Sequence, residues 1–200
     1  MSKAIWTINT IVNTQFLHDL SGSGTWENPV GGGQYFNDHI YFVATRNTDG
    51  KVVTGNDTNF SLEVKPHDNI QWVVNPSNLL NDNQYGVVMY GFETGSNWDN
   101  ALTSPDSRNV EAYFAQLTNG FNSPNQPSGN FLKGSSSEIS IPETNVKAEP
   151  KFNETISYHI KLILLDLSKP SQPKALKFVK ADPRFVIQKD LVYYENLQTV

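Results

Sequence analysis

The residues best suited to bind a ligand surround Trp98, in a stretch rich in glycine, serine and asparagine. Asn97, Asp99 and Asn100 flank this indole directly. An exposed tryptophan ring stacks on the C–H face of a sugar, while nearby amide and carboxylate groups bond its hydroxyls. Trp26 lies in another Gly/Ser-rich loop and has the same character. We therefore predict a carbohydrate site in these loops; the alternative is that Trp98 folds back and covers one end of the core.

The sequence contains two kinds of candidate metal ligands. Asp38 and His39 precede an expected strand, and with a distant third group they would form a metal site. Alternatively, His39 is a hydrogen-bonded residue at a strand edge. Calcium prefers hard oxygen ligands, and several Asn/Asp loops offer them: residues 47–50, 56–57, 81–83 and 97–100. These loops lack EF-hand spacing, and Asn and Asp are also common turn residues, so both interpretations stay open.

Signatures of catalysis and of cofactor binding are absent from the sequence. It contains no Cys, which excludes disulfides, thiol chemistry and Cys-ligated metals. The four His residues are scattered, and neither a phosphate-binding loop nor a nucleophile elbow occurs. Acidic residues that are neighbours in the sequence do not lie in an apolar setting of the kind that a glycosidase needs. We therefore expect a protein that is not an enzyme and holds no cofactor other than the calcium considered above.

Composition favours a single all-β domain. The chain has 200 residues and a formal net charge of −5, which argues against binding to nucleic acid or to an anionic membrane. Only 18% of the residues are charged, whereas 22 are Asn, a residue typical of turns. The sequence also lacks an apolar run of the length that a signal peptide or a membrane span needs. We expect a cytoplasmic protein without a signal peptide.

Alternation of apolar and polar residues is the main structural signal, and it is clearest at 156–164. Residues 60–64 and 70–74 alternate in the same way around a turn, which predicts a hairpin. Residues 85–92 are apolar without clean alternation, which predicts a central strand covered on both faces. Further strands are expected near the N-terminus, with Trp6, Ile8 and Val12 on one face, and at 40–46, 110–117, 176–180 and 185–188.

Eight to ten short strands separated by Gly/Asn/Pro/Ser clusters predict one domain over residues 1–200. The expected fold class is all-β, a single antiparallel β-sandwich of jelly-roll or immunoglobulin-like type with long loops. Residues 118–150 are predicted to form a long loop excursion or an extra hairpin. Loops of this length are uncommon in compact domains unless they have a function.

Several short motifs follow one another in an informative order. They are the N-terminal strand 5–9, the histidine-led strand 38–45, the run 53–64, the turn and strand 68–72, the strand 87–92, and the closing segments 158–165 and 177–183 with their Asp-Pro step. In this order they resemble the PixA/AidA family of bacterial inclusion-body proteins. The resemblance covers most of residues 4–190, and 119–150 are least alike.

The resemblance implies a bacterial, cytoplasmic and abundant protein that associates with itself and is not an enzyme. Low charge and the exposed strand edges expected of such a fold permit ordered self-association. The first hypothesis is therefore a homo-oligomer, at least a dimer, whose partner is a second copy and which can form inclusion bodies. The alternative is a lectin-like module that binds a glycan through the Trp98 loop, weakly at one site and more strongly through avidity.

Overall fold

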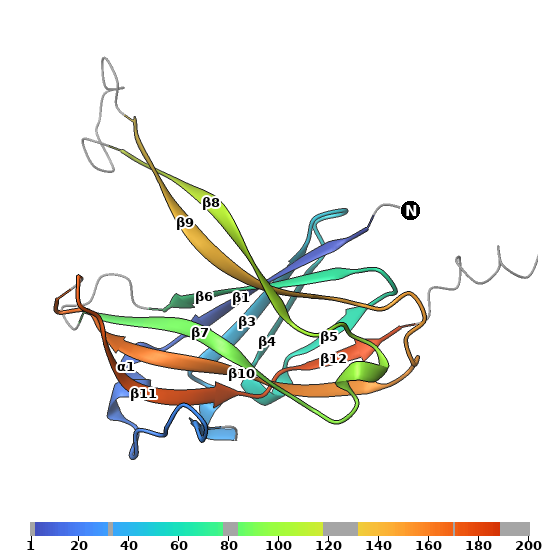
Figure 1. Ribbon diagram of the computed structural model, residues 1–200, viewed down its shortest axis with the longest axis horizontal. Coiled ribbons are helices and arrows are strands. Elements are labelled where there is room, and N and C mark those ends of the chain that lie inside the picture. Colours follow the sequence, from blue (N-terminus) through green and yellow to red (C-terminus); the bar gives the residue numbers. More distant parts are fainter. Residues whose placement is uncertain (1–2, 32–33, 78–83, 118–131, 170, 189–200) are drawn as a thin grey trace, which may run out of the picture.

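The structure, a computed structural model, describes residues 3–31, 34–77, 84–117, 132–169 and 171–188. The strands form two mixed sheets (Figure 1). Sheet A has the order β4 (Val52–Asn56), β3 (Ile40–Arg46), β1 (Ile5–Val12), β6 (Asn69–Pro76), β9 (Leu132–Asn145) and β8 (Asp106–Leu117). Sheet B has the order β2 (Val30–Gly31), β11 (Lys174–Ala181), β10 (Thr155–Asp166), β12 (Arg184–Ile187) and β5 (Ser61–Val64), and β7 (Tyr85–Thr94) also pairs with β10. The helical elements are α1 (Thr14–Asp19) and the 3-10 turns η1 (Gln34–Phe36), η2 (Asp57–Asn59) and η3 (Trp98–Asn100).

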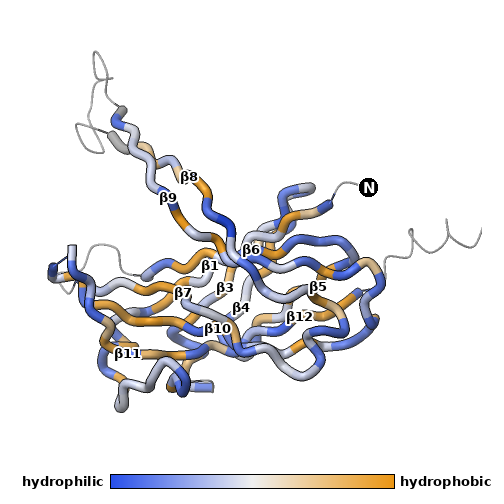
Figure 2. Tube along the Cα trace, in the orientation of Figure 1, coloured by the Kyte–Doolittle hydropathy of each residue, from blue (hydrophilic) through white to orange (hydrophobic). Residues whose placement is uncertain are grey.

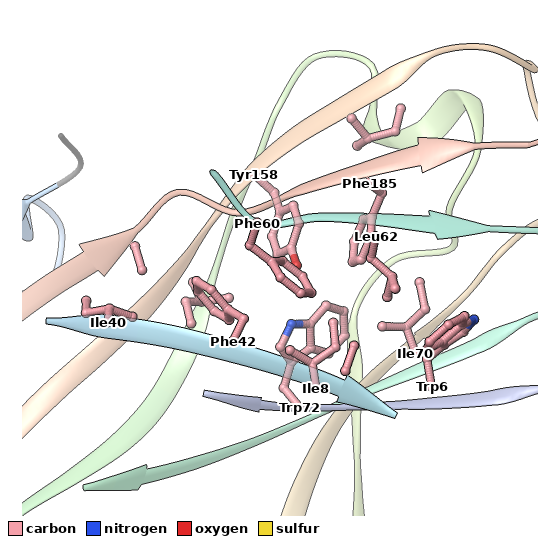
Figure 3. Packing of buried hydrophobic residues seen from close by; sticks show 14 of the residues in the cluster. Trp6, Ile8, Ile40, Phe42, Phe60, Leu62, Ile70, Trp72, Tyr158 and Phe185 are labelled. Atoms are coloured by element: carbon pink, nitrogen blue, oxygen red, sulfur yellow. The ribbon is translucent and has the colours of Figure 1, made fainter. Parts of the chain in front are cut away.

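The core lies between the inner faces of the two sheets. Alternate residues of β1 and β3, with Ile70 and Trp72 of β6, are buried on one side, and alternate residues of β5, β10 and β12 on the other, as the apolar stripes predict (Figure 3). Aromatic rings join the layers: Trp72 of β6 meets the rings of Tyr158 and Phe185 edge-on, each at 6.0 Å between ring centroids. Tyr158 and Phe185 stack at 4.6 Å. Burial of these large side chains is the main favourable term in folding.

Strand pairing is mixed, so the expectation of a purely antiparallel sandwich is wrong. β1 pairs with β6, β11 with β2, and β12 with β5, all in parallel. Period-two alternation fixes which face of a strand is buried, but it carries no information on strand direction or partner. The two layers and the all-β class are as expected, while the choice between jelly-roll and immunoglobulin-like type stays a prediction.

The predicted hairpin of 60–64 and 70–74 does not form. β5 belongs to sheet B and β6 to sheet A, so the turn between them carries the chain from one layer to the other. Asp68 shapes this turn, because its carboxylate accepts hydrogen bonds from the Lys65 backbone N–H at 3.0 Å and from the Trp6 indole at 3.2 Å. Burial raises the pKa of the Asp68 carboxyl. Both strands still bury one face, which is why the sequence pattern is the same for a hairpin and for a crossover.

At one edge of the molecule, one further expectation is corrected and one of two predicted alternatives is found. Among the described strands β7 pairs only with β10, and only Gly86 and Val87 of it are buried, so it is an edge strand and not a central one. Within 118–150, residues 132–145 form β9, which pairs with β8 over twelve residue pairs; this is the extra hairpin and not a loop. Residues 118–131 lie outside the described residues. The paired strands project away from the body as an arm (Figure 1).

Candidate functional site

Trp98 is part of the core. It opens the 3-10 turn η3, its side chain is only 2% exposed, and its ring lies 5.5 Å from that of Tyr158 and near those of Phe92 and Phe185. The indole N–H donates a hydrogen bond to the Thr103 carbonyl oxygen at 2.9 Å. Because its faces are covered, this ring is not available to stack on a sugar. Trp98 instead folds over one end of the core, which is the alternative that the sequence left open.

The polar neighbours of Trp98 hold this turn against the body. The side-chain amide of Asn97 donates to the Thr155 carbonyl at 2.8 Å, and that of Asn100 lies 3.4 Å from both carboxylate oxygens of Glu154. The backbone carbonyl of Asp99 accepts a hydrogen bond from the Lys147 ammonium group. These side chains bind the protein itself, so their local composition reflects a structural turn.

Asp38 and His39 lie at the start of β3, next to α1. The His39 ring stacks on that of Phe16 at 3.6 Å between centroids, and its Nδ1 lies 3.4 Å from the amide nitrogen of Asn13. The Asp38 carbonyl accepts a hydrogen bond from the Tyr41 hydroxyl at 3.1 Å. His39 thus helps to hold the α1 segment on the sheet. Across the described residues there is no group of three or more His, Cys, Asp or Glu side chains that could hold a metal ion.

Trp26 is the one predicted sugar-binding tryptophan with an exposed ring. Its side chain is 54% exposed and packs on Tyr90 of β7, at 4.4 Å between centroids, and on Phe178 of β11, at 6.2 Å. The Tyr90 hydroxyl donates a hydrogen bond to the Trp26 carbonyl at 3.0 Å, which fixes the loop. Trp26 and Trp98 therefore belong to separate aromatic clusters and do not form one site. We name Trp26, Tyr90 and Phe178 the aromatic platform.

An ion-pair cluster lies on neighbouring strands of sheet B. His159 of β10 places Nδ1 3.5 Å from a Glu93 carboxylate oxygen and Nε2 3.7 Å from one of Asp182. Lys180 lies 3.0 Å from Glu93, and its hydrogen bond lowers the pKa of that carboxyl. Lys180 offsets the charge of Glu93 on an open strand surface, which is the behaviour of a structural network. The sequence shows that these residues are polar and lie on expected strands, but it does not show that their side chains meet in the folded protein.

The outer face of sheet A has a composition that sequence analysis missed. Strand register places its outward side chains in three rows across β4, β3, β1 and β6. The rows are Val52, Thr45, Thr7 and Gln71; Thr54, Val43, Asn9 and Val73; and Asn56, Tyr41, Ile11 and Asn75. All twelve are uncharged, although the protein carries 35 Asp, Glu, Lys and Arg residues. We name this surface the uncharged face; a flat sheet surface of this kind suits contact with another protein surface.

Comparisons with known proteins agree with this architecture. The chain is similar to the crystal structure of the PixA inclusion body protein from Burkholderia cenocepacia J2315, with a TM-score of 0.61 over 94% of this chain and 97% of that one. The chain has the fold of a PixA inclusion body protein. Sequence identity between the two is 9%, so the likeness is one of fold. It confirms the resemblance to this family that the order of the motifs indicates.

Sequence comparisons find no such match: neither a family model nor a curated protein matches the chain. The shared PixA fold is therefore carried by strand order and core pattern and not by overall identity. In the described part of the chain, no helix is long and apolar enough to cross a membrane.

Proposed function

We propose that this chain is a self-associating, non-enzymatic protein of the inclusion-body type, acting in the cytoplasm of a bacterium. Its partner is a second copy of itself, and the smallest assembly is a dimer. The PixA fold supports this role, since the protein of similar structure is named an inclusion body protein. Ordered assembly needs a surface that can be removed from water at little electrostatic cost.

The uncharged face is the observation that carries this proposal. Val43 and Asn9 lie side by side at its centre, on β3 and β1, and all their cross-strand neighbours on this side of the sheet are uncharged. Burying such a surface desolvates hydroxyl and amide groups that can bond across the contact, and leaves no unpaired charge. The outer side of sheet B differs, because it carries the ion-pair cluster of His159, Glu93 and Lys180.

A charge placed in the middle of the uncharged face should disrupt self-association. We expect the purified protein to sediment at twice 22.4 kDa or more, and Val43→Lys to weaken the association by about 2 kcal/mol, or about 30-fold in dissociation constant, because the ammonium group loses its water. Val88→Lys is the matched control, since Val88 is 43% exposed on the outer side of sheet B. Analytical ultracentrifugation measures both.

Two results would contradict the proposal. A wild-type protein that stays monomeric at about 100 µM would exclude self-association at affinities relevant to an abundant protein. Equal dissociation constants for the Val43→Lys and Val88→Lys proteins would show that the uncharged face is not the contact.

Carbohydrate binding is the second candidate, and the exposed ring of Trp26 favours it. On a glycan array, the wild-type protein should bind a set of related sugars, and Trp26→Ala should reduce the signal at least about tenfold through loss of ring stacking. Tyr35→Ala removes another exposed aromatic ring and serves as the control. Parallel arrays with calcium and with chelator test the predicted calcium loops. An array without signal from folded wild-type protein would exclude this candidate.

A further inference from the structure

Among the residues that the structure describes, no further layer covers most of the length of the arm formed by β8 and β9. The two strands pair with each other through twelve residue pairs, but β9 joins the rest of sheet A only through 143–145, which pair with β6. From that point the ribbon leaves the body (Figure 1). A two-stranded ribbon is only marginally stable in water, and a third layer or strand normally supports it.

The two sides of the arm differ in chemistry. One side is polar and carries Glu111 directly opposite Glu138, with the Tyr113 hydroxyl donating a hydrogen bond of 2.6 Å to Glu111. The other side carries an apolar stripe from both strands: Val110, Ala112, Phe114, Ile139 and Ile141. Figure 2 shows apolar positions along both strands of the arm. The stripe includes Phe114, which is 54% exposed, so the ribbon is amphipathic like a strand pair that packs on a protein surface.

Register connects this apolar stripe to the uncharged face. Gln71, which ends the first row of that face, is paired with Glu143, and Ile141 and Ile139 follow at alternate positions on the same side of β9. Apolar stripe and uncharged face are thus one side of one sheet, and Arg108 and Glu143 pair at 3.9 Å where they meet. The twist of a two-stranded ribbon turns the stripe relative to the face.

The size of this combined surface matches a specific protein contact. Strand and residue spacings give each outward residue about 32 Å² of flat area, so the twelve residues of the face and about eight of the arm cover about 650 Å². Side-chain relief increases the accessible area above this flat value. A standard interface buries about 800 Å² on each partner.

We propose that the arm of one copy packs its apolar stripe against the uncharged face of a second copy, and that the second copy returns the same contact. This inference rests on the proposed self-association and names its geometry. Each chain carries both an arm and an uncharged face. A twofold axis therefore closes the dimer, with each arm packed on the uncharged face of the other copy. The uncharged face suits this occupant because its twelve residues carry no charge, so burying the face leaves none of its own groups ionised and unpaired.

Neighbouring residues on opposite sides of the arm provide the test. Phe114→Ser should raise the dimer dissociation constant by about tenfold or more, since a half-exposed ring loses its contact in both halves of the dimer. Tyr113→Ser changes an aromatic residue that is 77% exposed on the polar side, and should leave the constant within about twofold. Sedimentation equilibrium measures both, and circular dichroism verifies that each variant is folded.

Crosslinking shows directly which copy the arm touches. The chain has no Cys, so Ala112→Cys offers a single site for a benzophenone maleimide on the apolar stripe. In a mixture of normal and 15N-labelled protein, we expect crosslinks from position 112 of one copy to β1, β3 or β4 of the other. Crosslinks confined to the same copy, or an unchanged dissociation constant for Phe114→Ser, would overturn the arm contact. If the arm contact is overturned in this way but Val43→Lys still dissociates the dimer, the proposed self-association stands without the arm. A wild-type protein that stays monomeric overturns both the self-association and the arm contact.

Discussion

Replacing Trp98 by alanine should destabilise the protein by about 3–5 kcal/mol, the usual cost of removing a large buried aromatic ring. The ring packs against Phe92, Tyr158 and Phe185, which join the turn η3 to β7, β10 and β12 of sheet B. Its removal opens a cavity at this end of the core and leaves the carbonyl of Thr103 with only the hydrogen bond that the Thr144 hydroxyl donates to it. For a domain of this size the melting temperature should fall by about 10 °C.

Urea unfolding separates this core role from a role in ligand binding. Trp26→Ala is the control, because its exposed ring covers little of the core and should cost less than about 1 kcal/mol. Trp98→Phe should recover part of the loss, since a smaller ring keeps some contacts but not the hydrogen bond. Equal unfolding midpoints for Trp98→Ala and Trp26→Ala would refute the burial of Trp98.

Strand positions follow closely from the amino-acid pattern. The expected strand at 40–46 coincides with β3, and the stripe at 156–164 is fully buried in β10. The sequence of each strand indicates which face is buried, because the burial of alternate side chains is a local property of the chain. The partner of a strand is a non-local property: the same alternation serves β5 and β6 in different layers, and β1 finds its parallel partner about sixty residues later.

The strands of the arm, unlike those of the core, are poorly marked in the sequence. Residues 132–140 are rich in Ser and have weak alternation, since both sides of β9 face solvent along most of the ribbon. A strand outside the core has no buried face to mark it in the sequence, which is why the sequence left a loop excursion and an extra hairpin as open alternatives. Its apolar positions, such as Phe114 and Ile139, become informative only when the register shows that they share one side.

Local composition did not decide between a binding site at Trp98 and a ring folded over the core. A tryptophan among Asn, Asp and Gly residues occurs both in sugar sites and in turns that fold over a core, and the sequence does not contain the long-range contacts that separate them. The absence of charge at outward strand positions was available in the sequence. Thr7, Asn9 and Ile11 alternate with the buried residues of β1. Tyr41, Val43 and Thr45 alternate with those of β3 in the same way. Only strand order reveals that these positions form one surface.

Gly24→Ala should destabilise the protein strongly for so small a change, by about 3 kcal/mol or more. Gly24 has a φ of +62°, and an added Cβ would lie 2.5 Å from the Phe178 carbonyl oxygen and 2.9 Å from the Val30 nitrogen. Backbone strain and a clash with two backbone atoms then add together. The loop cannot simply move away, because the Phe178 N–H donates a hydrogen bond to the Ser23 carbonyl at 2.8 Å.

Gly50→Ala isolates the clash from the strain. Gly50 has a similar φ of +69°, but an added Cβ would meet nothing within 4 Å, so its substitution should cost only about 1 kcal/mol. Thermal unfolding of the two variants should therefore differ by at least about 4 °C. Similar melting temperatures would mean that the Gly24 loop is not anchored on β11. Because the Trp26 ring rests on Phe178 beside this anchor, Gly24→Ala should also disturb the aromatic platform, whereas Gly50→Ala should leave it intact.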